Sequence, residues 1–215
     1  MRIAVLSDIH GNLAALEAVV ADLRRRGVDG VVNLGDALSG PLLPQETAQY
    51  LMATTWIHLA GNHERQVLSP PMSNDDPSDV FARSELGHAE RHWIATLPHC
   101  RPFDNEILLC HGSPRRDNEC LLETIEPGRP RLATAAEIDE RLGEFQAAVV
   151  LCGHTHIPRA ARSSRGQLIV NPGSVGQPAW DDAMPFYHAV ENASPDARYA
   201  IVERRAARWR SELVA

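Results

Sequence analysis

The chain has 215 residues, of which 44 % are hydrophobic and 23 % are charged, and its formal net charge is -7 at pH 7. This composition is typical of a globular protein with a buried core, and the length favours one domain over residues 1–215. The acidic balance disfavours a large nucleic-acid partner, and no apolar run reaches the roughly 18 residues of a membrane-spanning helix.

Two further features of the composition exclude function classes. All 21 residues counted as lysine or arginine are arginines. Without lysine, Schiff-base catalysis and a phosphate-binding P-loop are excluded. The four cysteines form no Cys-x-x-Cys pair, and the N-terminus lacks the basic region and long apolar stretch of a secretory signal. We therefore expect reduced thiols and a cytoplasmic protein.

The first 60 residues alternate short apolar runs with segments of helical periodicity. Between residues 13 and 26, leucine and valine recur at helical spacing, and three arginines followed by Gly27 are typical of a helix end. The elements predicted here are, in chain order, a strand over 2–6, a helix over 13–26, a strand over 30–34, a helix over 46–52 and a strand over 56–60.

The remainder of the sequence contains two segments without apolar periodicity. Residues 69–79 are rich in proline, serine and aspartate and predict a surface loop, and residues 115–134 predict a long irregular excursion. The predicted elements are a helix over 78–97 capped by Ser78 or Asp79, a strand over 107–110, a helix over 135–142, and strands over 147–151, 167–170, 186–190 and 199–203. Strands alternate with helices early and dominate late, which is typical of an α/β protein whose later strands form a second sheet or an antiparallel extension.

Five polar clusters follow predicted strands, and each contains aspartate, asparagine or histidine beside a glycine. Ligands of open α/β sheets collect at the carboxyl ends of the strands, so we expect the clusters to converge on one site. Glycine permits tight turns and a close approach of the backbone to an ion or a phosphate. The clusters cover residues 7–12, 35–36, 61–64, 110–112 and 153–156.

The residue types in these clusters are those that two neighbouring divalent cations require. Imidazole binds first-row transition metals, whereas carboxylate and amide oxygens suit harder ions such as Mn²⁺ or Mg²⁺. Asp8 and His10 alternate along a segment that we expect to be extended, and so should point to the same side, as should His154 and His156. Asp36 is the only isolated carboxylate of the set, and its two oxygens could bridge two ions.

Taken singly, each cluster also has a purely structural explanation. A Gly-Asp pair is an ordinary turn, and an Asp-x-His or a His-x-His segment can be packed and hydrogen-bonded without a metal. That explanation would have to apply after five separate strands at once. The combination therefore indicates a metal centre.

These residues resemble the signature of the calcineurin-like metallophosphoesterases, and the match extends from residue 3 to about residue 177. The segments 7–12, 111–114 and 171–175 look like those of the small bacterial and archaeal phosphodiesterase group. The family's motifs stand here in order as Asp8-Ile9-His10, Gly35-Asp36, Gly61-Asn62-His63-Glu64, His111 and Gly153-His154-Thr155-His156.

The resemblance implies a fold and a ligand set. The fold would be a four-layer αββα sandwich, in which two mixed β-sheets are flanked by helices and a dimetal site lies at the sheet edge. His63 would lie near the leaving group without binding a metal. One ion would be bound by Asp8, His10 and His156 and a second by Asn62, His111 and His154, with Asp36 between them.

The resemblance also implies a reaction. A hydroxide held by two divalent ions would attack the phosphorus of a phosphodiester or a small phosphomonoester, with His63 as general acid and Asp36 supporting catalysis through the metals. Asn12, Glu64 and Arg65 are the candidate substrate contacts. Manganese is the favoured metal, with Fe, Zn, Ni or Co as alternatives. The expected partner is a small phosphate ester, and relatives suggest a homo-oligomer.

Two rival functions stay open at this stage. Protein phosphatases with a similar Gly-Asn-His-Glu motif carry Asp-Arg-Gly after the bridging aspartate, whereas residues 36–40 here contain no arginine, which weakens a phosphomonoesterase or protein phosphatase function. A non-catalytic, metal-dependent binding module is the other rival. Such modules typically lose ligands or the leaving-group histidine, and this chain keeps His63.

Other polar and aromatic residues are predicted to have structural roles. His88 and His92 are four apart on a predicted helix, but no third ligand is near them in sequence, so we expect them at the surface. His58 lies inside a predicted strand and should be packed. Trp180 either packs or lies at the edge of the substrate pocket.

Overall fold

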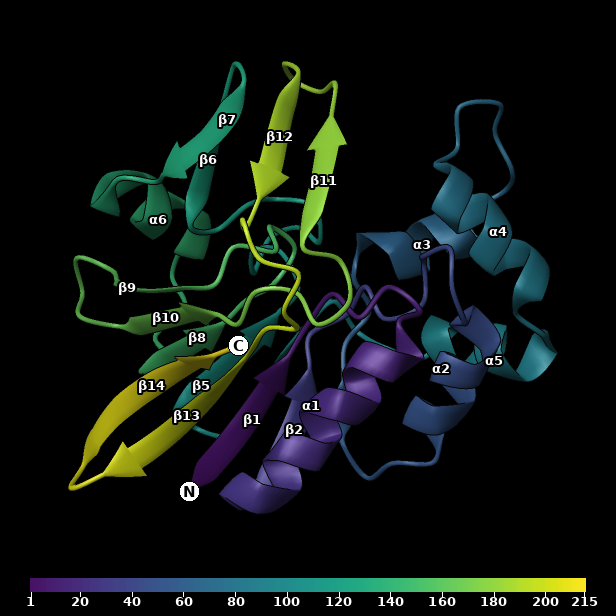
Figure 1. The fold of residues 1–215 in the computed structure, drawn as a ribbon. Coiled ribbons are helices and arrows are strands. Elements are labelled where there is room, and N and C mark those ends of the chain that lie inside the picture. Colours follow the sequence, from purple (N-terminus) through teal and green to yellow (C-terminus); the bar gives the residue numbers. More distant parts are fainter.

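The computed structural model describes residues 1–215 and contains two five-stranded sheets stacked face to face (Figure 1). The first consists of β1 (Arg2–Leu6), β2 (Gly30–Asn33), β3 (Ile57–His58), β13 (Tyr199–Arg205) and β14 (Arg208–Val214), and the second of β4 (Cys100–Pro102), β5 (Ile107–Cys110), β8 (Val149–Leu151), β9 (Arg159–Arg162) and β10 (Leu168–Asn171). Their strand orders are β14-β13-β1-β2-β3 and β4-β5-β8-β10-β9. The first sheet has the parallel strands β1, β2 and β3 on one side and the antiparallel strands β13 and β14 on the other. In the second sheet, the parallel strands β5, β8 and β10 form the middle, and the antiparallel strands β4 and β9 form the edges. Both sheets are therefore mixed.

Alternate residues of the central strands fill different layers. In β1, Ile3 and Val5 pack between the two sheets, whereas Ala4 and Leu6 pack against helices on the outer face. The second sheet behaves in the same way, since Ile107 of β5 points into the space between the sheets and other β5 residues point outward. Strands buried on both faces need apolar residues at every position, which is why these segments are continuous apolar runs.

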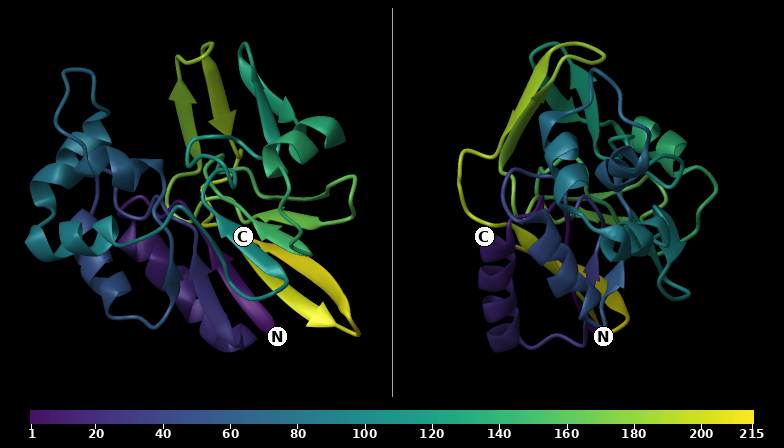
Figure 2. Two further views of the ribbon diagram at one scale, coloured as in Figure 1. Left: turned by 180° about the vertical axis from the view of Figure 1, so that it is seen from behind. Right: turned by 90° about the vertical axis from the view of Figure 1, so that its right-hand side faces the viewer.

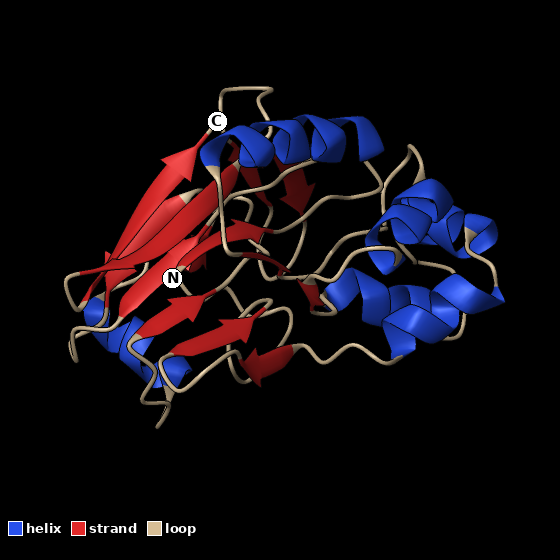
Figure 3. Cartoon of the chain, turned by 90° about the horizontal axis from the view of Figure 1, so that it is seen from below, coloured by secondary structure: helices blue, strands red, loops and turns tan.

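The helices cover both outer faces, as Figure 3 shows with α1 on one side of the sheets and α6 on the other. The first face is covered by α1 (Leu13–Arg26), α2 (Pro44–Met52), α3 (Asn62–Leu68), α4 (Pro77–Glu85) and α5 (His88–Ala95), and the second by α6 (Ala135–Leu142). The predicted α/β fold with four layers and two mixed sheets is confirmed. None of the helices combines the length and the hydropathy that crossing a membrane requires.

The single helix predicted over 78–97 is wrong. The segment forms two helices, α4 and α5, which are separated by extended backbone at Leu86 and Gly87. The break allows Leu86 to be buried in the core while α5 packs in a new direction. The first helix is capped by Asp76, whose side chain accepts a hydrogen bond from the Ser78 amide, and not by Ser78 or Asp79.

The irregular excursion predicted over 115–134 is also wrong in part, because it contains a β-hairpin formed by β6 (Glu123–Glu126) and β7 (Arg129–Leu132). A second hairpin, formed by β11 (Ala179–Asp182) and β12 (His188–Glu191), stands beside it at the same end of the molecule (Figures 1 and 2). Helix α3 and strands β4, β9, β11 and β14 were absent from the predicted elements. The strand predicted over 56–60 is reduced to the two residues of β3.

Candidate metal centre

The structure brings the five polar clusters together where β1, β2, β3, β5 and β8 end. The amide of His154 donates a hydrogen bond to Asp8 Oδ2 over 3.1 Å, which joins the cluster after β8 to that after β1. His111 Nε2 lies 2.9 Å from Asp36 Oδ2, and the amide of His63 donates to Asp36 Oδ1 over 2.9 Å. The carboxylate of Asp36 therefore contacts clusters from both sheets.

The ligand atoms form two groups of three. In one group, atoms of Asp8, His10 and His156 all lie within 4.8 Å of one another. In the other, atoms of Asp36 and two further histidines, His111 and His154, meet the same limit. Five of these six residues are buried, and the sixth, His154, is partly buried. Clusters of imidazole and carboxylate in this arrangement fit divalent transition metals.

The ring nitrogens of three histidines are oriented by backbone carbonyls. Nδ1 of His10 lies 2.6 Å from the carbonyl oxygen of Ser39, and Nδ1 of His156 lies 2.7 Å from that of Gln177. His111 has the same contact, at 2.9 Å, with the carbonyl of Leu34. A carbonyl can only accept, so each Nδ1 carries a proton, which leaves Nε2 as the atom through which each of these histidines could bind a metal.

The two Nε2 atoms of His10 and His156 lie 3.1 Å apart in a buried position. With both Nδ1 protons committed to carbonyls, two lone pairs face each other, an arrangement that is repulsive unless a positive charge lies close to both. A cation shared by the two imidazoles relieves this repulsion. The donor set therefore fits a metal at this position.

Two more buried atoms of the centre, Asp8 Oδ1 and Asn62 Oδ1, have no hydrogen-bond partner. Buried polar atoms in folded proteins are nearly always hydrogen-bonded, and each one left without a partner costs about 1–3 kcal/mol. Both belong to residues that the sequence assigns to metal binding. Metal coordination would satisfy them.

The backbone of the centre is left-handed, not extended as predicted. Asp8 and His10 have φ angles of 56° and 51°, Asp36 has 49°, and His154 and His156 have 69° and 59°. These are five of the eight non-glycine residues of the chain with positive φ. Such conformations cost about 1–3 kcal/mol each and cluster at functional sites. The side chains are thus aimed by turns after each strand and not by the alternation of a strand.

Gly61 illustrates how tightly the clusters pack. A Cβ atom at this position would lie 2.1 Å from Asp36 Oδ1 and 2.8 Å from the Asp36 amide nitrogen. Both distances are shorter than any contact between non-bonded atoms of these types. Only glycine allows the start of α3 to approach the carboxylate of Asp36 this closely.

Burial and neighbouring charges set the protonation of the centre. Burial lowers the pKa of His10 to about 3 and that of His154 to about 4, so both imidazoles are neutral at pH 7. Burial acts to raise the pKa of Asp36, but the nearby imidazoles, His111 above all, hold it well below its usual range. Burial acts to lower the pKa of His111, but the Asp36 carboxylate raises it to about 9, so a cation bound there would displace a proton from this ring. His10 and His154 are already neutral and Asp36 is already ionised, which are the forms that bind cations.

His63 lies beside the two groups of ligand atoms and is held by the carboxylate of Asp79, which the sequence predicts only as a possible helix cap. Its Nδ1 donates to Asp79 Oδ1 over 2.8 Å, and the ring centroid is 5.4 Å from that of His10. The hydroxyl of Ser39 also donates to Asp79, over 2.7 Å. Burial acts to lower the pKa of His63, but the carboxylates of Asp36 and Asp79 raise it to about 10.

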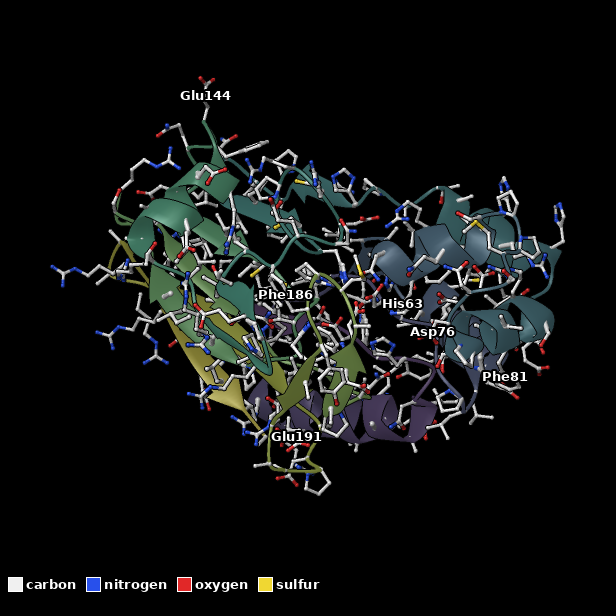
Figure 4. All side chains as sticks on the ribbon, turned by 90° about the horizontal axis from the view of Figure 1, so that it is seen from above. His63, Asp76, Phe81, Glu144, Phe186 and Glu191 are labelled. Atoms are coloured by element: carbon white, nitrogen blue, oxygen red, sulfur yellow. The ribbon has the colours of Figure 1, made fainter.

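The position of Asp79 in its helix indicates a buried role. It is 2 % exposed and shares the buried face of α4 with Ala82, three residues further on. A carboxylate on the apolar stripe of an amphipathic helix needs a buried partner. The partner here is His63, which in Figure 4 faces the helices on the α4 side of the molecule.

The three residues predicted as substrate contacts all make other interactions. Glu64 is buried and accepts hydrogen bonds from the amides of Asp36, Ala37 and Gly61 at 2.7–2.8 Å, so it fastens α3 to the turn after β2. Arg65 forms a two-point ion pair with Asp117. Asn12 accepts from the Ala15 amide as the cap of α1, and its side-chain amide donates to the carbonyl of Gly176.

Residues assigned to structural roles lie outside the centre. His88 and His92 are exposed on α5, with stacked rings 6.3 Å apart. His58 is buried and packs against Trp93. Trp180 of β11 lies closer to the centre, since its ring centroid is 6.0 Å from that of His156.

The fold and the centre together define the class of a calcineurin-like phosphoesterase. The family model of the calcineurin-like phosphoesterase superfamily domain matches residues 1–192, and the chain belongs to this superfamily. The resemblance inferred from the motifs is confirmed. The superfamily consists of phosphoesterases that use divalent metals.

Individual relatives are similar over most of their length. The chain is 27 % identical over 194 residues to an uncharacterized protein of Methanocaldococcus jannaschii, which covers 82 % of this chain and 76 % of the relative. The crystal structure of a metallophosphoesterase from Sphaerobacter thermophilus superposes with a TM-score of 0.77 at 27 % identity, over 100 % of this chain and 88 % of that one. A protein from Pyrococcus horikoshii, at 18 % identity, shares the fold with a TM-score of 0.71 over 99 % and 87 % of the two chains.

Proposed function

We propose that this protein hydrolyses phosphodiesters at a centre of two divalent cations. Asp8, His10 and His156 would hold the first cation, Asn62, His111 and His154 would hold the second, and Asp36 would take part in both positions. The observation that carries the proposal is the pair of Nε2 lone pairs of His10 and His156, 3.1 Å apart. When bound, two such cations supply a nucleophile from water near neutral pH and neutralise charge on the phosphoryl oxygens.

His63 is the general acid of this proposal. Its Nδ1–H donates to Asp79, so Nε2 is the atom that faces outward and carries the transferable proton. The pKa of about 10 keeps the ring protonated before the reaction. Donation of that proton to the departing oxygen neutralises the alkoxide as the bond to phosphorus breaks. Asp79 then stabilises the orientation of the ring without taking the proton itself.

The preference for diesters rests on the charges around the centre. A phosphomonoester carries one more negative charge than a diester near neutral pH. Arg65 is paired with Asp117, and Arg115 is paired with Glu119, so neither guanidinium is free to bind that extra charge. No arginine follows Asp36 within the next four residues. These features support a singly charged phosphoryl group as the substrate.

The metal and the compartment follow from the ligands and the thiols. Mixed imidazole and carboxylate ligands suit manganese, and we propose Mn²⁺ as the native ion. All four cysteines are free thiols, which supports a reducing compartment such as the cytoplasm.

The test is turnover of bis-p-nitrophenyl phosphate and of p-nitrophenyl phosphate by protein that is stripped of metal and refilled with Mn²⁺. We expect faster cleavage of the diester and no cleavage before refilling. Faster cleavage of the monoester would replace the phosphodiesterase by a phosphomonoesterase. Absence of turnover of both esters, with two metals bound, would contradict the proposed function.

A further inference from the structure

The β11–β12 hairpin is fastened to the candidate centre at both of its ends. At the start of the hairpin, the carbonyl of Gln177 accepts from Nδ1 of His156 over 2.7 Å. After its last strand, the side-chain amide of Asn192 donates to the carbonyl of His156 over 2.7 Å. A ligand bound at the centre is therefore adjacent to this hairpin.

The hairpin is also braced along its length. The amide of Gly128, in the turn of the β6–β7 hairpin, donates to the carbonyl of Tyr187 over 2.8 Å, and the amide of Ala189 donates to the Gly128 carbonyl over 3.2 Å. The two hairpins stand side by side in Figures 1 and 2. The tip of the β11–β12 hairpin is thus held in place by a second hairpin and presents its side chains in a fixed position.

Large apolar side chains are concentrated on this hairpin and remain exposed. At the tip, Met184 is 71 % exposed, Phe186 is 54 % exposed and Tyr187 is 62 % exposed. Nearer to the centre, Trp180 has its ring beside that of His156, and its indole N–H is buried without a partner. Seen along the hairpins in Figure 4, Phe186 lies towards the middle of the molecule, in the direction of His63, whereas Glu191 lies at the periphery.

The charges on the hairpin limit what these aromatic residues can bind. Asp181, Asp182 and Glu191 are all exposed on it. A ligand with several phosphates would be repelled by these carboxylates. An uncharged planar group attached to a single phosphate is repelled less.

We infer that the β11–β12 hairpin binds the organic group of the substrate, and that Phe186 and Tyr187 stack on a planar group such as a nucleobase. The substrates would then be nucleotide diesters with one phosphate and not polyphosphates. This inference rests on the proposed phosphodiesterase function. Stacking on aromatic side chains suits nucleobases because every base has a π-face.

The experiment compares two esters that share a leaving group, the p-nitrophenyl ester of thymidine 5′-monophosphate and methyl p-nitrophenyl phosphate. With manganese-loaded wild-type protein, we expect a higher kcat/KM for the thymidine ester. In the double variant F186A/Y187A, the ratio of the two kcat/KM values should fall about tenfold, mainly through the KM of the thymidine ester. The matched control is Phe145→Ala, because Phe145 is 45 % exposed on a loop after α6, and it should leave the ratio unchanged.

A binding measurement keeps the inference testable if turnover fails. Thymidine 5′-methylphosphate has a poor leaving group, and calorimetry of its binding to the manganese-loaded protein needs no hydrolysis. We expect its dissociation constant to rise about tenfold in F186A/Y187A and not in Phe145→Ala. Equal affinity in wild type and the double variant, or an equal loss of activity towards both esters, would overturn the inference. Diadenosine tetraphosphate cleaved faster than the thymidine ester would overturn the restriction to one phosphate.

Discussion

The candidate metal centre and its rim are built from different kinds of sequence. Each ligand of the centre lies within a few residues of a strand end and is fixed by a local turn, a glycine or a backbone carbonyl. The rim comes from segments inserted between these strands, on one side α4 with Asp79 and on the other the hairpin with Phe186. The comparison teaches that the candidate ligands are positioned by local rules, whereas the proposed contacts with the substrate depend on tertiary packing.

The largest effect on turnover is expected from His63, which is the proposed proton donor and is held by Asp79 of the rim. Replacing His63 by alanine should lower kcat by about 10²–10⁴-fold, because the departing oxygen loses its proton donor. Metal content measured by elemental analysis should stay the same, since His63 is not one of the ligands. His92→Ala, which removes an exposed histidine on α5, is the control. Unchanged turnover would remove His63 from the mechanism.

A smaller effect is expected from the residue that holds His63. Asp79→Asn should lower kcat by about 10–100-fold, as is usual for residues that orient a functional histidine. The Asp79 carboxylate stabilises the protonated ring, so its removal lowers the pKa of His63. The general acid must be protonated, and the alkaline limb of the kcat profile should therefore move to lower pH.

The control for this variant is Asp76→Asn. Asp76 caps the same helix, and asparagine caps a helix about as well as aspartate, so α4 should be preserved. A pH profile that shifts equally in both variants would show that Asp79 acts through the stability of α4 and not through His63.

The smallest effect on turnover is expected from Glu64, which lies behind the centre. Glu64→Gln should lower the free energy of unfolding by about 1–3 kcal/mol, because an amide has one acceptor oxygen and leaves buried backbone N–H groups without a partner. Urea denaturation measures this change, with the exposed Glu46→Gln as control. A drop in kcat at unchanged stability would instead return Glu64 to the role of a substrate contact.

The same division explains how much could be predicted from the sequence. The strands β1, β2, β5 and β8 are continuous apolar runs, and the polar clusters after them are short, so both the sandwich and the ligand residues are readable. The left-handed φ angles of Asp8 and His10 cannot be predicted from the sequence, because the pattern of the preceding strand continues into these residues without a break. The end of α4 before Leu86 cannot be predicted either, because it is determined by burial of the Leu86 side chain in the core.

The interactions made by the candidate substrate contacts were the least predictable feature of the site. Arg65 follows the Gly-Asn-His-Glu motif directly, and its pairing with Asp117, more than fifty residues away, cannot be inferred from either segment alone. The β6–β7 hairpin contains arginine, glutamate and proline, which mask the alternation typical of strands. The conformation of Arg65 therefore depends on its contact with Asp117, and that of β6 and β7 depends on their pairing with each other.

The central claim is that two cations share the centre through Asp36, and a count of bound metal tests it most directly. Protein stripped with chelator, refilled with Mn²⁺ and freed of excess metal should contain about two ions per chain by elemental analysis. Asp36→Asn should lower the occupancy of both positions, because Asp36 belongs to one group of ligand atoms and is proposed to hold both ions. Wild-type protein that binds no metal, or an Asp36→Asn variant that keeps both ions, would contradict the account.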